Sequence, residues 1–257
     1  MNKIFVLVFA LAVLARLTSD ANAQAQMETY TNEDIVRNFE IVALRSEYEK
    51  RKEKTVLKWD EPWRIAIIGK NYPPFFEEMI REHLADLSWE TRHPMKIHYS
   101  ETMRQQKRLA KDVSKVKINI VLFYGPKRTL ADTIFKRTGG AFPKKDIQYL
   151  IDNSICSVKL KHRKGAIHFA YAAFPAEHNR HALRACIIEE LTQIMGSIND
   201  SRFVERSIFN DHSRYLELTL HDRWLLRVLY NSEMKPGMPA DQALKKARRY
   251  LSVIRPE

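Results

Sequence analysis

The amino-acid sequence predicts a single α/β domain, in which a mixed, twisted sheet with a backing helix precedes a largely helical carboxyl-terminal part. Two short apolar runs rich in β-forming residues, RIAIIG at 64–69 and VKINIVLFY at 116–124, predict central strands. A segment with helical spacing of apolar residues lies between them, and capped helical segments follow residue 179. Only seven glycines and the lack of an obvious repeat argue against a propeller or a solenoid.

The first residues have the features of a secretory signal peptide. Lys3 precedes an apolar run at 4–14, and small residues lead to an expected cleavage site after Ala23. The apolar run is shorter than the roughly 20 residues that span a bilayer, and no later segment is long and apolar enough to do so. We therefore expect residues 1–23 to be removed and 24–257 to be a soluble, exported domain, periplasmic or secreted, without a transmembrane segment.

The first half of the mature chain is predicted to begin with a helix at 31–54, capped by Asn32, with a strand at 39–44 as the alternative. The RIAIIG run is then the first core strand. A helix starts near Pro74 and places apolar residues on one face. His83 lies on that face, so we interpret it as a core histidine and not as a metal ligand.

Two more strands are predicted at 95–100 and 116–124, joined by a polar segment that forms a loop or a short helix. A hairpin comes next, with arms at 155–161 and 166–173 and a turn at 162–165. Alternating lysines on the first arm are typical of an edge strand that is protected from pairing with other chains.

The second half is predicted to contain three helices. Asn179 is the expected cap of the first, and Gly196 ends it. Thr219 and Asp222 have the spacing of a capping box for the second helix, and Pro239 starts the last one. No linker separates the two halves, so both belong to one domain.

The formal charge of +12 at pH 7 favours anionic partners. Export makes nucleic acid an unexpected partner, and the basic clusters lack the aromatic interleaving of an RNA-binding sheet. The expected partner is therefore an unknown protein or an anionic polymer of the cell envelope.

Two cysteines, Cys156 and Cys186, remain in an oxidising compartment after export. The simplest interpretation is one disulfide that closes a loop of about 31 residues and stabilises the fold by roughly 3 to 4 kcal/mol on the chain-entropy model. Two buried free thiols are the alternative.

The segment CIIEELTQIMGSIND, at 186–200, keeps the spacing of a zinc-peptidase helix but not its metal ligands. In the HExxHxxGxxH pattern, two histidines on one helix face bind the metal, the glutamate activates water, and the glycine lets the chain return with a third ligand. With Gly196 as the anchor, the pattern reads Glu189, Glu190, Gln193, Gly196 and Asn199.

The sequence after this helix is also similar to that of zincin peptidases of the metzincin type. Ser207-Ile208-Phe209 resembles the turn beneath their metal, and LTLHDRWLLRVLY resembles the segment that opens their last helix. The strand and helix order of the first half is similar as well. More closely, ACIIEELTQIMG, SIFND and LLRVLYNSEMKPGM resemble a family of exported bacterial proteins that share a domain of unknown function. The resemblance covers 156–243 well; it implies a zincin-like fold and carries no activity over.

Glu190 is the residue whose chemistry needs an explanation. It projects only ~20° from the apolar stripe of the same helix, at 100° per residue, so its carboxyl should be buried. Because burying an unpaired carboxylate is costly, Glu190 needs a metal, an arginine or a raised pKa. The apolar stripe consists of Leu183, Ile187, Leu191 and Ile194.

Three interpretations of this helix are open. In a pseudoenzyme, hydrogen bonds or an ion pair with Arg184 or Arg206 would hold Glu190, and the former cleft would bind a partner or nothing. In the second, oxygen ligands would bind a divalent cation such as Ca²⁺ or Mg²⁺; these ligands are Glu189, Gln193, Asn199 and Asp200. In the third, outside histidines would rebuild a zinc site around Glu190; these are His178, His181, His212 and His221.

Other catalytic motifs are absent, since the sequence contains no G-x-S-x-G elbow and no phosphate-loop or dinucleotide fingerprint. We interpret the protein as a non-catalytic binding protein with a degenerate metallopeptidase-like site and no resident cofactor. The alternative is a metal-dependent hydrolase that uses Glu190 as general base, with a divalent cation in an oxygen-rich site.

Overall fold

The computed structural model describes residues 30–44, 55–210, 212–213 and 215–256. The predicted signal peptide and the last ten residues of the predicted helix at 31–54 lie outside these ranges. Within the described ranges, no helix combines the length and the apolar character that crossing a membrane requires.

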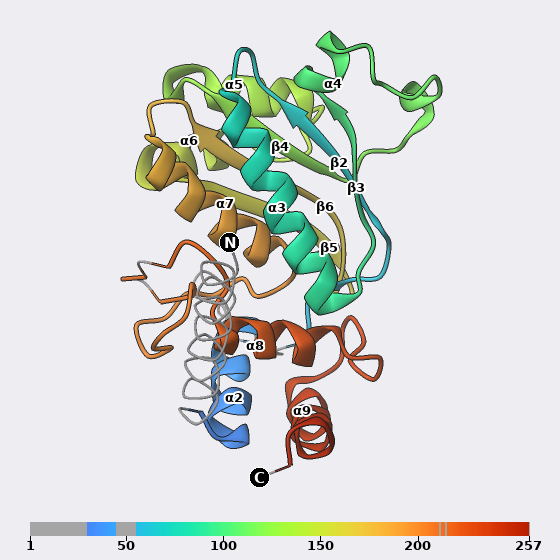
Figure 1. The fold of residues 1–257 in the computed structure, drawn as a ribbon, viewed down its shortest axis with the longest axis vertical. Coiled ribbons are helices and arrows are strands. Elements are labelled where there is room, and N and C mark those ends of the chain that lie inside the picture. Colours follow the sequence, from blue (N-terminus) through green and yellow to red (C-terminus); the bar gives the residue numbers. More distant parts are fainter. Residues whose placement is uncertain (1–29, 45–54, 211, 214, 257) are drawn as a thin grey trace, which may run out of the picture.

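A six-stranded sheet forms the centre of the fold (Figure 1). Strands β3, β2, β4 and β6 lie side by side and run parallel, β5 pairs antiparallel with β6 at one edge, and β1 adds a short parallel pair at the start of β6. The prediction of a mixed α/β fold is confirmed. The strands are β1 Lys58–Trp59, β2 Trp63–Ile68, β3 Met95–Ser100, β4 Ile120–Gly125, β5 Ser157–Arg163 and β6 Ala166–Pro175.

Helices cover both faces of this sheet, which explains the continuous apolar runs in the central strands. On one face, α3 (Pro74–Thr91) and α7 (Arg180–Ile194) pack over the larger core, which includes Ile65 and Leu122. On the other face, α5 (Lys127–Arg137) and α6 (Lys144–Asn153) pack over a second core that includes Phe123. Helices α3 and α7 were predicted from the sequence, whereas α5 and α6 were not.

The helical part lies below the sheet in Figure 1 and unites the two ends of the described chain. Helix α2 (Asn32–Phe39) continues as a π-helix, η1 (Glu40–Leu44), and packs against α8 (Leu220–Tyr230) and α9 (Ala240–Ile254). The helix prediction is confirmed up to residue 44, and the alternative strand at 39–44 is wrong. The cap is Thr31, not Asn32, because the Thr31 hydroxyl accepts a hydrogen bond from the amide of Asp34.

Several predicted boundaries differ from the structure; the hairpin arms, predicted at 155–161 and 166–173, are Ser157–Arg163 and Ala166–Pro175. The strand predicted from 116 begins at Ile120, because the amide of Val116 closes the 3₁₀ turn η2 (Val113–Lys115); a short helix, α4 (Glu101–Gln105), precedes that turn. The β5–β6 hairpin is confirmed, but its turn is only Lys164–Gly165, and both residues have positive φ, as a tight two-residue turn requires.

Cys156 and Cys186 form the predicted disulfide, with their Cα atoms 5.9 Å apart. The bond joins the chain just before β5 to the middle of α7. Replacing both cysteines by serine is expected to lower the free energy of unfolding by about 3 to 4 kcal/mol, because the unfolded chain regains the freedom of the closed loop. Urea denaturation of the oxidised wild type and of the double variant measures this loss. A loss below about 1 kcal/mol would show that the bond constrains the unfolded state far less than its loop length implies.

Candidate functional site: the α7 helix and the turn that follows it

Hydrogen bonds fix helix α7 at both ends, and only the one at its start was predicted from the sequence. At its start, the predicted cap Asn179 accepts a hydrogen bond from the amide of Ala182, at 2.9 Å. At its end, the carbonyl oxygen of Ile194 accepts from the Trp59 indole at 2.8 Å, and that of Met195 accepts from the Tyr230 hydroxyl at 2.9 Å. The helix therefore holds its side chains against β5, β6 and α3 in one orientation.

Gly196 ends the helix, as predicted, with a backbone that only glycine adopts readily. Its φ is +118°, and a Cβ atom at this position would lie 2.1 Å from the carbonyl oxygen of Leu57. The chain can therefore turn sharply and return past the helix towards Asn199.

Two of the four residues predicted as oxygen ligands are in contact with each other, and a third is bound elsewhere. Gln193 donates from Nε2 to the Oδ2 atom of Asp200 at 2.8 Å. Asn199 donates from Nδ2 to the carbonyl oxygen of Ile41 at 3.0 Å, and its backbone amide donates to Val42 at 3.2 Å. The amino-terminal π-helix η1 thus lies against Asn199, the residue that the sequence pattern places at the third ligand position.

The remaining predicted ligand, Glu189, is half-buried on α7. Its negative charge acts on the neighbouring Glu190. The amide groups of Gln193 and Asn199 donate hydrogen bonds within the protein, which disfavours a cation site. The Oδ1 atom of Asn199, however, has no hydrogen-bond partner among the described residues. A divalent-cation site made of Glu189, Gln193, Asn199 and Asp200 therefore stays a prediction.

Glu190 is buried, as its place on the apolar stripe predicts, with 6% of its surface exposed. Its carboxyl makes no hydrogen bond or ion pair with any described residue. Burial raises its pKa well above the ordinary value, and the charges of Glu189 and Asp200 raise it further. The ion pair with Arg184 proposed from the sequence is absent, because Arg184 donates to Glu82 and to the carbonyl of Leu216.

Replacing Glu190 by glutamine is expected to stabilise the protein in alkaline solution. Because the folded-state pKa is raised, the carboxyl favours folding while it is protonated, and this contribution is lost as the pH rises through the folded pKa. The melting temperature of the variant should exceed that of the wild type at about pH 8, and the difference should shrink towards about pH 5. The exposed Glu78→Gln on α3 is the matched control and should change little at either pH. A variant that melts below the wild type at high pH would contradict the assignment of a buried carboxyl without a partner among the described residues.

The turn after α7 is fixed by the predicted capping residue Asp222, which is fully buried. Its carboxylate accepts hydrogen bonds from the Ser207 hydroxyl at 2.5 Å and from the amide and hydroxyl of Thr219 at 2.8 Å. The amide of Ile208 lies 3.3 Å from both carboxylate oxygens. Burial raises the pKa of Asp222 to about 6, although the hydrogen bonds from Ser207 and Thr219 lower it. The capping prediction is confirmed, and Asp222 joins the 207–209 turn to α8.

The histidines that could have rebuilt a zinc site do not gather around Glu190. His221 is buried, contacts Asn38 at 3.1 Å and stacks on Tyr30, while His181 and His212 are exposed. Among the described residues, a single group of three or more His, Cys, Asp or Glu side chains has its ligand atoms within 4.8 Å of one another, and it contains Cys156, His178 and Cys186.

His83 is a core residue, as predicted. It lies 3.0 Å from the Thr192 hydroxyl on α7, and burial lowers its pKa to about 3. A small hollow at the surface beside this contact is lined by residues of α3 and α7, among them Glu82 and Arg184, and by Glu217. Nothing in the sequence indicated the His83–Thr192 pair, because 109 positions separate the two residues.

The fold and the site define a mixed α/β protein in which a largely buried helix, α7, ends at Gly196. A family model described as "Protein of unknown function (DUF2927)" matches residues 32–249, and the chain belongs to this family. The domain of unknown function expected from the sequence is therefore confirmed. No curated protein matches the chain.

Proposed function

We propose that this protein is an exported, zincin-like pseudoenzyme that binds a partner in the cell envelope or outside the cell. The order of the elements supports the zincin-like fold, since a strand, a backing helix, two strands and a hairpin lead into a buried helix that ends at Gly196. The turn at 207–209 follows that helix in the sequence, as the turn beneath the metal does in zincins. Its buried Ser207–Asp222 hydrogen bond shows that the turn is held in place, which agrees with a zincin-like fold.

One observation carries the non-catalytic part of the proposal: the side chains at the ligand positions bind the protein itself. Gln193 is held by Asp200, and Asn199 is held by the backbone of η1. A neutral amide is a poor zinc ligand, and an amide that donates to an internal acceptor is less free to turn towards a metal. Burial raises the pKa of Glu190, which favours the protonated carboxyl, and a protonated carboxyl cannot accept a proton from water.

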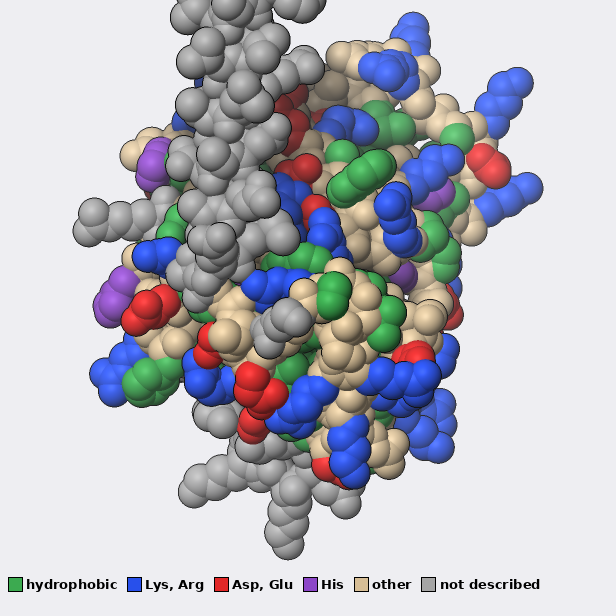
Figure 2. All heavy atoms as spheres, turned by 60° about the horizontal axis from the view of Figure 1, so that its bottom comes forward, with side chains coloured by type: hydrophobic (Ala, Val, Ile, Leu, Met, Phe, Trp, Pro, Cys, Tyr) green, Lys and Arg blue, Asp and Glu red, His purple; other side chains and the backbone are tan. Residues whose placement is uncertain are grey.

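The disulfide supports the proposed export of the protein, and the surface charge supports an anionic partner. Disulfides persist mainly in oxidising compartments, which agrees with export. Figure 2 shows Lys and Arg side chains spread over the face that carries the helical part, with Asp and Glu side chains between them. With a formal charge of +12, such a surface attracts anionic polymers or acidic proteins through its general field.

The alternative, a metal-dependent hydrolase with Glu190 as general base, is favoured by one observation. Glu190 is a buried residue whose carboxyl makes no hydrogen bond with the described residues, and the buried Oδ1 atom of Asn199 has no hydrogen-bond partner among them either. A bound cation would satisfy such oxygens and would lower the pKa of the carboxyl.

Titration of the oxidised, untagged protein with Zn²⁺, Ca²⁺ and Mg²⁺ separates the two functions. The proposal expects an unchanged melting temperature with each ion and no hydrolysis of peptide or glycan substrates. A saturable rise in melting temperature that Gln193→Ala abolishes, and that the exposed His181→Ala does not affect, would contradict it and support the hydrolase. Both variants must first be shown to melt cooperatively without metal.

A further inference from the structure

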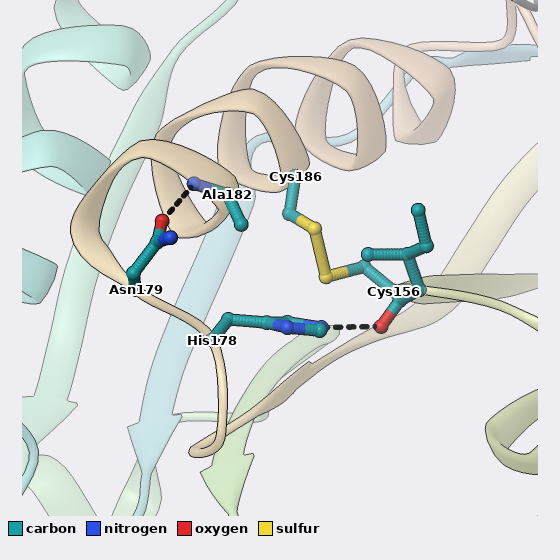
Figure 3. Close-up of a disulfide and its surroundings, with 6 residues drawn as sticks. Cys156, His178, Asn179, Ala182 and Cys186 are labelled. Carbon is teal, nitrogen blue, oxygen red and sulfur yellow. Dashed lines mark hydrogen bonds between the residues drawn. A yellow bond between two sulfur atoms is a disulfide. The ribbon is translucent and has the colours of Figure 1, made fainter.

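The disulfide lies beside a histidine, and the three side chains form a compact group at one corner of the sheet. The ligand atoms of Cys156, His178 and Cys186 all lie within 4.8 Å of one another. Figure 3 shows the imidazole of His178 extending beneath the two sulfur atoms. None of the residues at the motif positions of α7 belongs to this group, so a role for the group is independent of the proposed pseudoenzyme function.

Three separate elements bring these side chains together. Cys156 follows α6 and directly precedes β5, whereas Cys186 lies in the second turn of α7. His178 is in the short connection between β6 and α7, where its amide donates to the carbonyl of Pro175 at 3.3 Å. The neighbouring residue, Asn179, caps α7 (Figure 3). Strand pairing and helix capping therefore hold the corner in place in addition to the covalent bond.

The orientation of His178 is the second observation that points to a ligand. Its Nε2 atom lies 2.8 Å from the carbonyl oxygen of Ile155. Because a carbonyl oxygen only accepts, Nε2 carries the proton, and in the neutral ring Nδ1 therefore keeps its lone pair. Metal-binding histidines are usually held in this way, with the other ring nitrogen donating to a carbonyl or a carboxylate.

We propose that reduction of the disulfide converts this corner into a Zn²⁺ site with two thiolate ligands and one imidazole ligand. A dithiol reductant supplies two electrons and two protons, so that the S–S bond breaks, two thiols form and the reductant leaves as its own disulfide. Zn²⁺ then replaces the two thiol protons, which pass to solvent, and the Nδ1 atom of His178 binds the ion without losing a proton. A water molecule completes the tetrahedron.

The chemistry of the donor set selects zinc over harder cations. Thiolates with an imidazole suit Zn²⁺, whereas Ca²⁺ and Mg²⁺ require oxygen ligands. Two thiolates about 2.3 Å from a tetrahedral ion lie about 3.8 Å apart, a spacing that side-chain rotation can reach between Cα atoms 5.9 Å apart. Cys156 and Cys186 are buried while His178 is half-buried, so the ion would have one side open to solvent.

Cobalt(II) is the probe that tests this proposal, because thiolate and tetrahedral coordination both give it characteristic absorption bands. The full chain is reduced with a water-soluble phosphine, desalted without oxygen and titrated with Co²⁺. The expected result is one Co²⁺ per chain with thiolate charge-transfer bands, displacement by Zn²⁺, and no such bands in the oxidised protein. Circular dichroism before and after reduction is expected to show the same helix and strand content.

Single-residue variants then assign the ligands. His178→Ala keeps both cysteines and is expected to weaken Co²⁺ binding by at least roughly tenfold, whereas the exposed His181→Ala, one turn away, leaves it unchanged. Glu190→Gln also leaves it unchanged, which separates this site from any metal bound by the α7 motif. Undiminished binding in His178→Ala, failure of the folded reduced protein to bind Co²⁺, or unfolding on reduction would each overturn the proposal.

Discussion

Gly196→Ala is expected to lower the free energy of unfolding by about 3 kcal/mol or more, since backbone strain and a steric clash each cost about 1 to 3 kcal/mol. A φ of +118° is strained for any residue with a side chain, and the added Cβ would lie 2.1 Å from the carbonyl oxygen of Leu57. That oxygen belongs to backbone, so the clash is relieved only by moving the end of α7 or the segment before β1.

Gly139→Ala is the matched control, because this glycine also has positive φ, at +61°, but no atom lies within 4 Å of a Cβ built there. It carries the milder strain of left-handed backbone without the clash and is expected to cost about 1 to 2 kcal/mol. Urea denaturation of both variants measures how much more the strain and the clash at Gly196 cost. Equal losses in the two proteins would show that the return of the chain past α7 is not as tight as the structure has it.

Asp222→Ala is expected to cost about 3 kcal/mol or more, because it removes a buried acceptor and leaves several donors without a partner, each costing about 1 to 3 kcal/mol. The affected donors are the Ser207 hydroxyl, the Ile208 amide and the amide and hydroxyl of Thr219. Both the start of α8 and the 207–209 turn lose their fixed position. Urea denaturation of the variant and the wild type measures the loss.

Asp34→Ala in α2 is the control for Asp222→Ala, since Thr31 and Asp34 form the same capping box on a more exposed helix. It is expected to cost only about 1 kcal/mol. A loss for Asp222→Ala as small as that for Asp34→Ala would contradict the proposed role of Asp222 in holding the turn.

The two carboxyls should also differ in the sign of their pH dependence. The pKa of Asp222 is raised to about 6 from 3.8, so the stability that it contributes is greatest when it is protonated and falls as the pH rises from about 4 to about 6. The pKa of Asp34 is lowered by hydrogen bonds from Thr31, so its contribution is present above the unfolded-state pKa and is lost as the pH falls. Unfolding measured across this range in both variants checks the two signs.

The sequence predicted the elements whose signals are local. The Thr219–Asp222 capping box, the Asn179 cap and the hairpin arms each depend on residues a few positions apart, and all are confirmed. The disulfide was predictable because the chain has only two cysteines. The burial of Glu190 followed from helical periodicity alone.

The sequence could not predict contacts that cross the fold. Asn199 binds Ile41 across 158 positions, so nothing near the α7 motif revealed that the amino-terminal segment would lie against it. The same holds for the placement of His178 beside the disulfide, which depends on how β5, β6 and α7 pack together. The α5 and α6 helices were missed although Pro126 and Pro143 precede them, because their apolar faces cover a single small core.

The central claim is that the α7 site of the oxidised protein is not a metal centre, and elemental mass spectrometry tests it most directly. The protein is purified without a histidine tag or chelator and kept oxidised, with Glu190→Gln prepared alongside. We expect no stoichiometric metal in either protein. A tightly held metal ion in every wild-type chain, lost in Glu190→Gln while the fold is kept, would contradict the claim and make the metal-dependent hydrolase the better account.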